Sequence, residues 1–207
     1  MNNNLNINEI QKGTQHLLRN DKYLATLIKK IGKCNLRLHD DYYLALLQSI
    51  ICQQLSSKAA DSIYKRFMIY FNRDPSPVKI LETEHSLIRN IGLSNSKVKY
   101  IKDLSEKIIT KEIILQNINS KPDEEIISEL IKVKGIGVWT VHMFLIFSVG
   151  RLNVLPTGDL GLKRAIMLTY KLRKLPDEKR FIRISRENNW KPYCSIASWY
   201  LWKSLEK

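Results

Sequence analysis

Two glycines separated by one isoleucine, in VKGIGVWT (Val133–Thr140), stand between two segments whose apolar residues have helical spacing. Glycine lacks a Cβ atom and accepts a positive φ, so a foreign backbone can approach its amide closely. The amides at the start of the second helix, from Gly137 onward, lack helical partners and lie at the positive end of the helix dipole. Ile136 is expected to turn inward and join the two helices. The pattern predicts an anion site at the tip of a helical hairpin, although glycines that only permit tight packing of a helix–helix corner would look the same.

A single aspartate, Asp159, ends the stretch LPTGD (Leu155–Asp159) and precedes a predicted helix. The proline and glycine of this stretch rigidify and turn the loop, which leaves the carboxylate at the start of the helix. Aspartate is a common N-cap residue, so capping alone would explain its presence. A cap position also keeps a carboxylate ionised and oriented, so capping and catalysis are compatible roles.

The charge of the chain narrows the class of partner. Thirty-four Lys and Arg against twenty Asp and Glu give a formal net charge of +14. A surplus of this size favours a polyanionic partner, with nucleic acid foremost, over a lysine-rich surface that only aids solubility. The anion predicted at the hairpin is then a nucleic-acid phosphate, bound by the amides of Gly135 and Gly137 and by the hydroxyl of Thr140. Lys132 and Lys134 add positive charge beside it.

The cysteines argue against a metal or disulfide framework. Cys34, Cys52 and Cys194 are scattered, no pair has C-x-x-C spacing, and the four histidines do not cluster with them.

The first residues do not form a secretory signal, and no apolar run is long enough to span a bilayer. We expect a cytoplasmic protein, associated with the nucleoid if bacterial, with no membrane partner.

The apolar spacing is helical almost throughout, and alternation with period two is essentially absent, which predicts an all-α fold. Leu24, Leu27, Ile28 and Ile31 share one helix face that ends at Gly32. Ser120 is expected to cap the first hairpin helix, which ends at Gly135, and the second helix is expected from about Val138 to Gly150. Further helices are expected to start at caps that include Asp40 or Asp41, Ser56 or Ser57, and Ser94 or Ser96.

The stretch LIKVKGIGVWTVHMFLIFSVGRLNVLPTGDLGLKRAI resembles the helix–hairpin–helix and Gly/Pro-rich loop with aspartate of base-excision DNA glycosylases. It is most similar to their alkyladenine branch, DNA-3-methyladenine glycosylase II. SIICQQLSSKAADSIYKRF, IGLSNSKVKYIKDLSEKI and WKPYCSIASWYLWK match other helices of the family, so the resemblance extends from about Gln48 to Lys203. It implies a single two-lobed helical glycosylase domain over residues 1–207, in the compact form without an additional N-terminal β domain. The hairpin would span about 122–149 and the catalytic loop 151–159.

The resemblance implies that Asp159 is catalytic. A purine methylated at N3 or N7 is positively charged and leaves readily, and a fixed carboxylate stabilises the oxocarbenium character that develops in the sugar. The same carboxylate could orient or deprotonate the attacking water. Because the bond is inaccessible inside the duplex, the nucleotide must be flipped out. The implied enzyme is a monomer that releases 3-methyladenine from double-stranded DNA and leaves an abasic site. Whether 7-methylguanine is also a substrate depends on the shape of the pocket, which the sequence leaves open.

Trp139 lies where superfamily members with lyase activity carry a nucleophilic lysine, two residues beyond the second glycine. Tryptophan cannot form a Schiff base with the sugar, so the resemblance implies a monofunctional enzyme. An indole also suits a cationic purine, through stacking and a cation–π attraction of roughly 0.5–2 kcal/mol. Tyr193, Met143 and Leu160 match the same base-binding pocket, and packing in the core is the alternative for Trp139, Met143 and Leu160.

Other features of the family match the segment around Gln53 and Gln54 and the tip of the hairpin. Gln54, which follows Gln53, matches the side chain that the family inserts into the gap left by the flipped nucleotide; a polar residue at a helix end is the alternative. The backbone carbonyls of Ile131, Val133 and Ile136 match those that hold a monovalent cation at the hairpin, and no cofactor is required. Two positions depart from the family pattern, because Lys134 stands where many members have proline and Cys194 where arginine is usual.

Two other functions stay open on the sequence. The first is a non-catalytic hairpin module that binds DNA backbone or recruits repair partners, which would need neither Asp159 nor an aromatic pocket. The second is a glycosylase for another damaged base. The combined glycosylase/lyase form of the second is disfavoured by the tryptophan at position 139 and by the lack of an iron–sulfur cysteine set.

Overall fold

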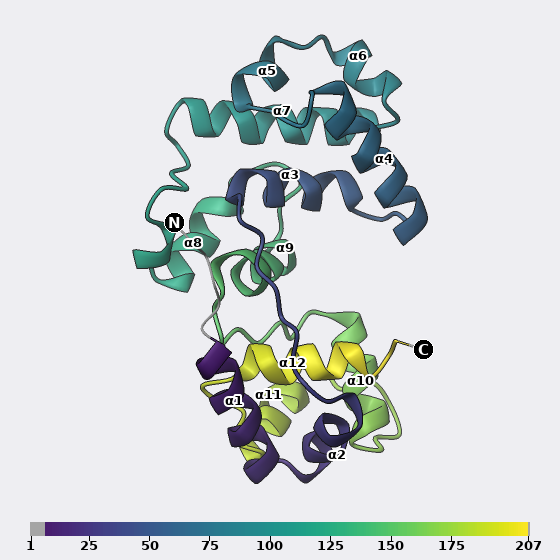
Figure 1. Ribbon diagram of the computed structural model, residues 1–207, viewed down its shortest axis with the longest axis vertical. Coiled ribbons are helices and arrows are strands. Elements are labelled where there is room, and N and C mark those ends of the chain that lie inside the picture. The colour runs from purple at the N-terminus through teal and green to yellow at the C-terminus, as the bar shows by residue number, and fades with distance from the viewer. Residues whose placement is uncertain (1–6, 207) are drawn as a thin grey trace. The chain divides into compact units, whose positions relative to one another are not determined.

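The computed structural model describes residues 7–206, which form helices and turns and contain no strand (Figure 1). This confirms the predicted all-α class. The chain divides into two compact units. Unit 1 combines Met1–Asp40 with Leu145–Lys207, and unit 2 is Asp41–Phe144.

Unit 1 is built around its last helix. Figure 1 shows α12 (Cys194–Lys203) amid the other helices of this unit, and every residue from Cys194 to Leu201 is buried. A helix that is apolar on all sides requires neighbours on all sides. Here α12 contacts α1, α2 and α10. The elements of this unit are α1 (Ile7–Asn20), α2 (Lys22–Ile31), the π-helical turn η2 (Leu145–Val149), α10 (Leu160–Thr169), α11 (Glu178–Glu187) and α12.

Unit 2 packs around α7 (Asn95–Ile109). This helix contacts α3, α5 and α6, and its buried apolar side chains are Val98, Ile101 and Leu104. The pair α8 and α9 forms the predicted helical hairpin, and α9 also contacts α3. The other elements are α3 (Tyr42–Cys52), α4 (Ser57–Tyr70), α5 (Pro77–Glu82), α6 (His85–Asn90), the 3₁₀ turn η1 (Ile118–Ser120), α8 (Asp123–Leu130) and α9 (Val138–Phe144).

Helix caps fall largely where the sequence predicts them. The side chains of Asp41, Ser56 and Ser94 accept backbone N–H groups at the starts of α3, α4 and α7, and Gly32 ends α2 with φ 83°. Each cap satisfies an amide that a helix start leaves without a partner.

The first hairpin helix differs from its prediction at both ends. Ser120 does not cap it, because this residue lies in the 3₁₀ turn η1 and Pro122 occupies the N-cap position. Three acidic residues in the first turn of α8 face the positive end of its dipole. The helix ends at Leu130 rather than Gly135, since Lys132 and Val133 donate to carbonyls three residues back. These tighter bonds end the α-helix five residues before the glycine.

A buried carboxylate fixes the packing of unit 1. Asp21 is fully buried and caps α2 through the amides of Tyr23 and Leu24. Its Oδ2 atom also accepts the Tyr170 hydroxyl and the Trp190 indole N–H, the latter at 2.8 Å. Burial, and then the charge of Asp21, raise the pKa of Tyr170, which keeps the phenol protonated as a donor.

Replacing Asp21 with alanine should therefore destabilise the protein strongly. The substitution removes the cap and leaves the Tyr170 and Trp190 donors buried without an acceptor, at about 1–3 kcal/mol each. We expect a loss of about 3–5 kcal/mol in the free energy of unfolding, measured by urea denaturation. Asp177→Ala is the matched control, because Asp177 caps α11 through the Arg180 amide at an exposed site. Its loss should be about 1 kcal/mol, and equal losses in both variants would contradict the role given to Asp21.

Candidate functional site

Unit 1 holds the loop that carries Asp159 through one buried serine. The Ser195 hydroxyl donates to the carbonyl of Arg151 at 2.7 Å and accepts the amide of Val154 at 3.0 Å. The Ser195 amide donates to the Leu152 carbonyl at 2.9 Å. Ser195 is fully buried on α12. Three hydrogen bonds from one residue of the central helix therefore fix the first half of the 151–159 loop.

Asp159 is the N-cap of α10 and is 7% exposed. Its Oδ1 atom accepts the Leu162 amide at 2.6 Å and the Trp202 indole N–H at 3.1 Å. Both bonds orient the carboxylate, which lies at the positive end of the α10 dipole. A Cβ atom on Gly161 would stand 3.1 Å from Oδ1, so a glycine at this position leaves room for the carboxylate. The cap role inferred from the sequence is confirmed, and the geometry holds a charged group in a fixed direction.

Trp202 is a site residue that the sequence argument misses. It lies near the end of α12, donates to Asp159 and packs against Phe147 with ring centroids 5.7 Å apart. Trp202 and Asp159 are 43 residues apart. The sequence gives little indication of this contact, since Trp202 is one of two tryptophans in a helix whose residues are typical of a buried core.

The predicted base-pocket residues of unit 1 are placed differently from one another. Leu160 follows Asp159 and is 67% exposed, so it is not a core residue. Tyr193 lies at the N-cap of α12, nine residues from Trp202, or roughly 13 Å along the helix axis. Its ring packs on Gly13 and His16 of α1. Nine residues of α12 therefore separate Tyr193 from the indole that contacts Asp159.

The two hairpin glycines of unit 2 have different surroundings. Gly135 has φ 83°, and a Cβ atom there would come within 2.2 Å of the Tyr100 ring. Gly137 has no atom within 4 Å of the same position and no positive φ. Gly135 is thus required by the fold of the turn, whereas the fold leaves the space above Gly137 empty. Between them Ile136 is buried, as predicted.

The side chains predicted around the hairpin phosphate are only partly available. Lys132 and Lys134 are exposed. Thr140 is 5% exposed, which corrects the prediction that its hydroxyl faces the phosphate. The physical reason is helical geometry: Thr140 begins the buried side of α9 together with Val141 and Phe144, one and four residues on.

The turn that follows α3 separates the two glutamines predicted as a wedge. Gln53 donates from Nε2 to the Gly135 carbonyl at 2.8 Å, so its side chain braces the hairpin. Gln54 is exposed and has φ 55°, a left-handed conformation that is uncommon for a residue other than glycine. Such conformations often occur at functional sites, so Gln54 is the better candidate of the two.

Comparison with known proteins decides the family of this chain. The model of the HhH-GPD superfamily of base excision DNA repair proteins matches residues 47–192. This chain belongs to that superfamily. The matched range includes the hairpin, the 151–159 loop and Asp159.

Known members cover almost the whole chain. The alkylbase DNA glycosidase-like protein mag2 of Schizosaccharomyces pombe is 30% identical over 201 residues, which cover 94% of this chain and 93% of mag2. The putative DNA-3-methyladenine glycosylase YfjP of Bacillus subtilis is 32% identical over 96% of this chain and 70% of its own. The structure of S. pombe 3-methyladenine DNA glycosylase Mag1 in complex with abasic DNA matches with a TM-score of 0.84 and 32% identity, covering 93% of this chain and 96% of Mag1.

In this HhH-GPD protein the other two predicted pocket residues belong to unit 2. Trp139 is 49% exposed on the first turn of α9, and Met143 is half-buried one turn further along the helix. The exposure of Trp139 argues against a purely structural role in the core. An exposed indole offers a flat face on which another aromatic ring can stack.

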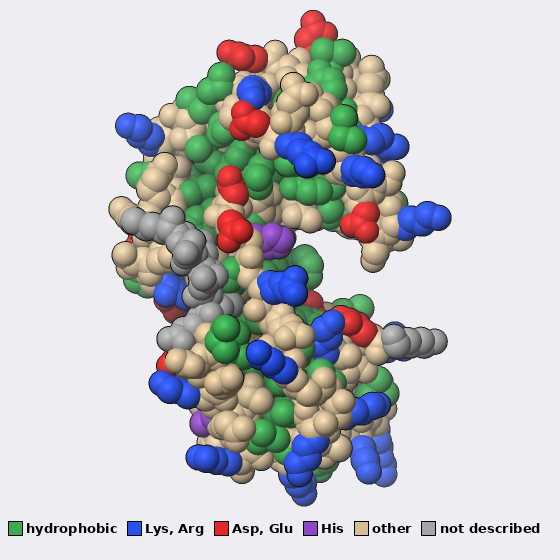
Figure 2. Space-filling view, in the orientation of Figure 1, with side chains coloured by type: hydrophobic (Ala, Val, Ile, Leu, Met, Phe, Trp, Pro, Cys, Tyr) green, Lys and Arg blue, Asp and Glu red, His purple; other side chains and the backbone are tan. Residues whose placement is uncertain are grey.

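The positive charge of this HhH-GPD protein is concentrated in unit 1. Unit 1 contains 20 Lys and Arg against 8 Asp and Glu, whereas unit 2 contains 14 against 12. Figure 2 shows Lys and Arg side chains across the visible face of unit 1 and mixed charges on that of unit 2. Among the described residues no helix could span a membrane, and no group of three or more His, Cys, Asp or Glu could hold a metal ion.

Substitution by alanine should lower the free energy of unfolding at Gly135 but leave it nearly unchanged at Gly137. Gly135→Ala places a methyl group against the Tyr100 ring at a positive φ, and we expect a loss of at least about 1–2 kcal/mol in unfolding free energy. Gly137→Ala meets no neighbouring atom and should leave the unfolding free energy within about 0.5 kcal/mol of wild type. Urea denaturation of both variants provides the measurement. Equal effects would contradict the division between a structural glycine and a solvent-facing one.

Proposed function

We propose that the protein is a monofunctional DNA glycosylase that hydrolyses the N-glycosidic bond of alkylated purines, 3-methyladenine above all, and leaves an abasic site. The observation that carries the proposal is Asp159, a carboxylate held in one direction at a helix start within the loop that the superfamily model matches. The names of the relatives supply the substrate class, since they include DNA-3-methyladenine glycosylases.

Asp159 acts on charge that develops in the sugar. As the bond between the cationic purine and C1′ breaks, the sugar gains oxocarbenium character, which an ionised carboxylate stabilises. Water adds at C1′, and Asp159 orients it or accepts its proton. Leu162 and Trp202 hold the carboxylate through Oδ1, so it need not reorganise during the reaction. Because the purine leaves as a neutral base, no acid is needed to protonate it.

The tryptophan after the glycines limits the chemistry to hydrolysis. Trp139 has no nucleophilic nitrogen for a Schiff base, so the enzyme does not nick the strand. Its exposed ring offers a stacking and cation–π surface to the flipped base, with Met143 on the same helix as a further contact.

DNA is held by backbone contacts at the hairpin. The open space at Gly137 admits a phosphate to the amides at the start of α9, and Lys132 adds charge. Gln54 enters the gap left by the flipped nucleotide. A monovalent cation would be held by the carbonyls of Ile131, Val133 and Ile136. The Val133 carbonyl already accepts the Ile136 amide at 3.1 Å, so only its second lone pair would bind the cation.

The proposed enzyme acts as a monomer on DNA in the cytoplasm. The three cysteines are free, and Cys34 and Cys194 are buried. Burial raises the pKa of Cys34 to about 11, which keeps this thiol protonated and unreactive. Free, inert thiols fit a reducing compartment.

Asp159→Asn should abolish base release while DNA binding persists. Asparagine retains an oxygen for the Leu162 and Trp202 donors, so the cap and the fold survive and only the charge is lost. We expect the single-turnover rate of 3-methyladenine release to fall by at least about 100-fold, with an unchanged affinity for abasic DNA. Release of 3-methyladenine by the variant at the wild-type rate would contradict the mechanism. If the wild type binds abasic DNA but releases no base from any alkylated duplex, the protein is a hairpin binding module.

A further inference from the structure

One face of α7 supports both turns that the proposed function assigns to DNA. Lys97, Tyr100 and Asp103 are spaced three residues apart on this helix and share a face. Tyr100 lies against Gly135, and Asp103 contacts Lys134, the residue before that glycine. The tip of the hairpin therefore rests on the middle of α7.

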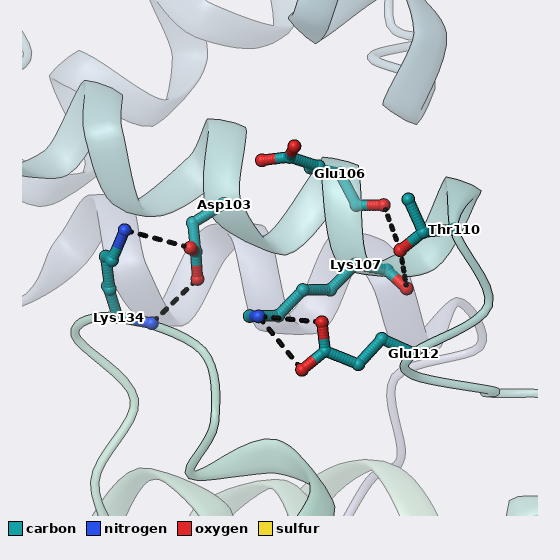
Figure 3. A network of polar contacts seen from close by, with 6 residues as sticks. All are labelled: Asp103, Glu106, Lys107, Thr110, Glu112 and Lys134. Carbon is teal, nitrogen blue, oxygen red and sulfur yellow. Dashed lines mark hydrogen bonds and ion pairs between the residues drawn. The ribbon is translucent and has the colours of Figure 1, made fainter.

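Asp103 binds the hairpin through two bonds of unequal strength. Its Oδ2 atom accepts the Lys134 backbone amide at 2.9 Å, and its Oδ1 atom lies 3.4 Å from Lys134 Nζ (Figure 3). The Lys134 side chain is 72% exposed, so water screens the ion pair and it contributes little. The Asp103 side chain is only 12% exposed, and a carboxylate that accepts a backbone amide forms a strong, charge-assisted bond. The backbone bond is the one that matters.

Lys97 holds the second turn from the same helix. Its Nζ atom donates to the carbonyls of Ile51 and Gln53 at 2.8 and 2.7 Å, which fixes the end of α3 immediately before Gln54. The Gln53 side chain then reaches the Gly135 carbonyl. The two turns are thus tied to α7 and to each other by the side chains of Lys97, Asp103 and Gln53, each of which bonds to a backbone group of a turn.

A carboxylate beside a phosphate-binding turn is electrostatically unfavourable, because it repels the phosphate that the turn is proposed to bind. The presence of this carboxylate is explained if holding the turn in place contributes more to phosphate binding than one negative charge takes away. We propose that Asp103 is a positioning residue for DNA binding: by accepting the Lys134 amide, it holds the Gly135–Gly137 turn in the form that receives a phosphate. Many members of the family have proline where this chain has Lys134, and proline has no amide hydrogen. Lys134 has one, so it can donate to Asp103.

The test rests on the sign of an affinity change. Asp103→Ala removes the acceptor and a negative charge, whereas Asp103→Asn removes the charge but keeps an oxygen for the Lys134 amide. Glu112→Ala is the charge-matched control, because Glu112 lies in the same unit and pairs with Lys107 at 2.9 and 3.0 Å rather than with Lys134 (Figure 3). The measurement is the Kd for a duplex containing an abasic site at several salt concentrations, with folding checked by circular dichroism.

Positioning predicts that Asp103→Ala binds about tenfold more weakly than wild type, although its net charge is more favourable. Asp103→Asn and Glu112→Ala should bind as tightly as wild type or more tightly. If Asp103→Ala and Asp103→Asn both bind more tightly, Asp103 acts only as a repelling charge and the proposal is overturned. Equal weakening by Asp103→Ala and Asp103→Asn would also overturn it, since the asparagine keeps the acceptor.

The inference rests on the proposed contact between the hairpin and a phosphate, so that contact needs its own control. Gly137→Ala leaves the fold intact by the reasoning above and places a methyl group where the phosphate would approach. If Gly137→Ala weakens binding and Asp103→Ala does not, only the positioning role fails. If Gly137→Ala binds as wild type does, the hairpin contact itself is wrong and the role of Asp103 is withdrawn with it.

Discussion

The hydrogen bonds that α12 makes to the loop preceding α10 are the interaction on which the chemistry of unit 1 depends. Ser195 and Trp202 are seven residues apart, which places them on one side of the helix two turns from each other. Ser195 fixes the start of the 151–159 loop, and Trp202 fixes the carboxylate at its end. Because α12 is buried along most of its length, neither anchor can shift without disturbing the core. A rigid helix therefore sets the direction of Asp159.

In unit 2, the turns proposed to bind DNA are held in the same way. The hairpin and the turn after α3 are each tied to α7 by side chains of that helix that bond to their backbone groups. Bonds of this kind fix the course of the main chain, which is what an amide-based phosphate site requires. The same arrangement explains why one hairpin glycine lies against a ring while the other faces empty space.

Local sequence signals predict the helix starts and the two turns, because caps, glycines and apolar spacing act within a few residues. Asp41, Ser56, Ser94 and Asp159 cap helices as predicted. The contacts that position the site are not local: Asp103 meets Lys134 across 31 residues, and Gln53 meets Gly135 across 82. Nothing in the residue types alone pairs them. Helix α11 is not predicted from the sequence. Most of its residues are charged and only Phe181, Ile184 and Ser185 are buried, so its apolar spacing is too short to indicate a helix.

In the proposed function, the chain hydrolyses the bond between an alkylated purine and its sugar and does nothing further to the strand. The most direct measurement incubates the wild-type protein with a duplex containing 3-methyladenine and quantifies free base and strand breaks in the same samples. We expect release of free 3-methyladenine from a strand that stays continuous until it is treated with alkali. Strand breaks without alkali, or no free base from DNA that the protein binds, would contradict it.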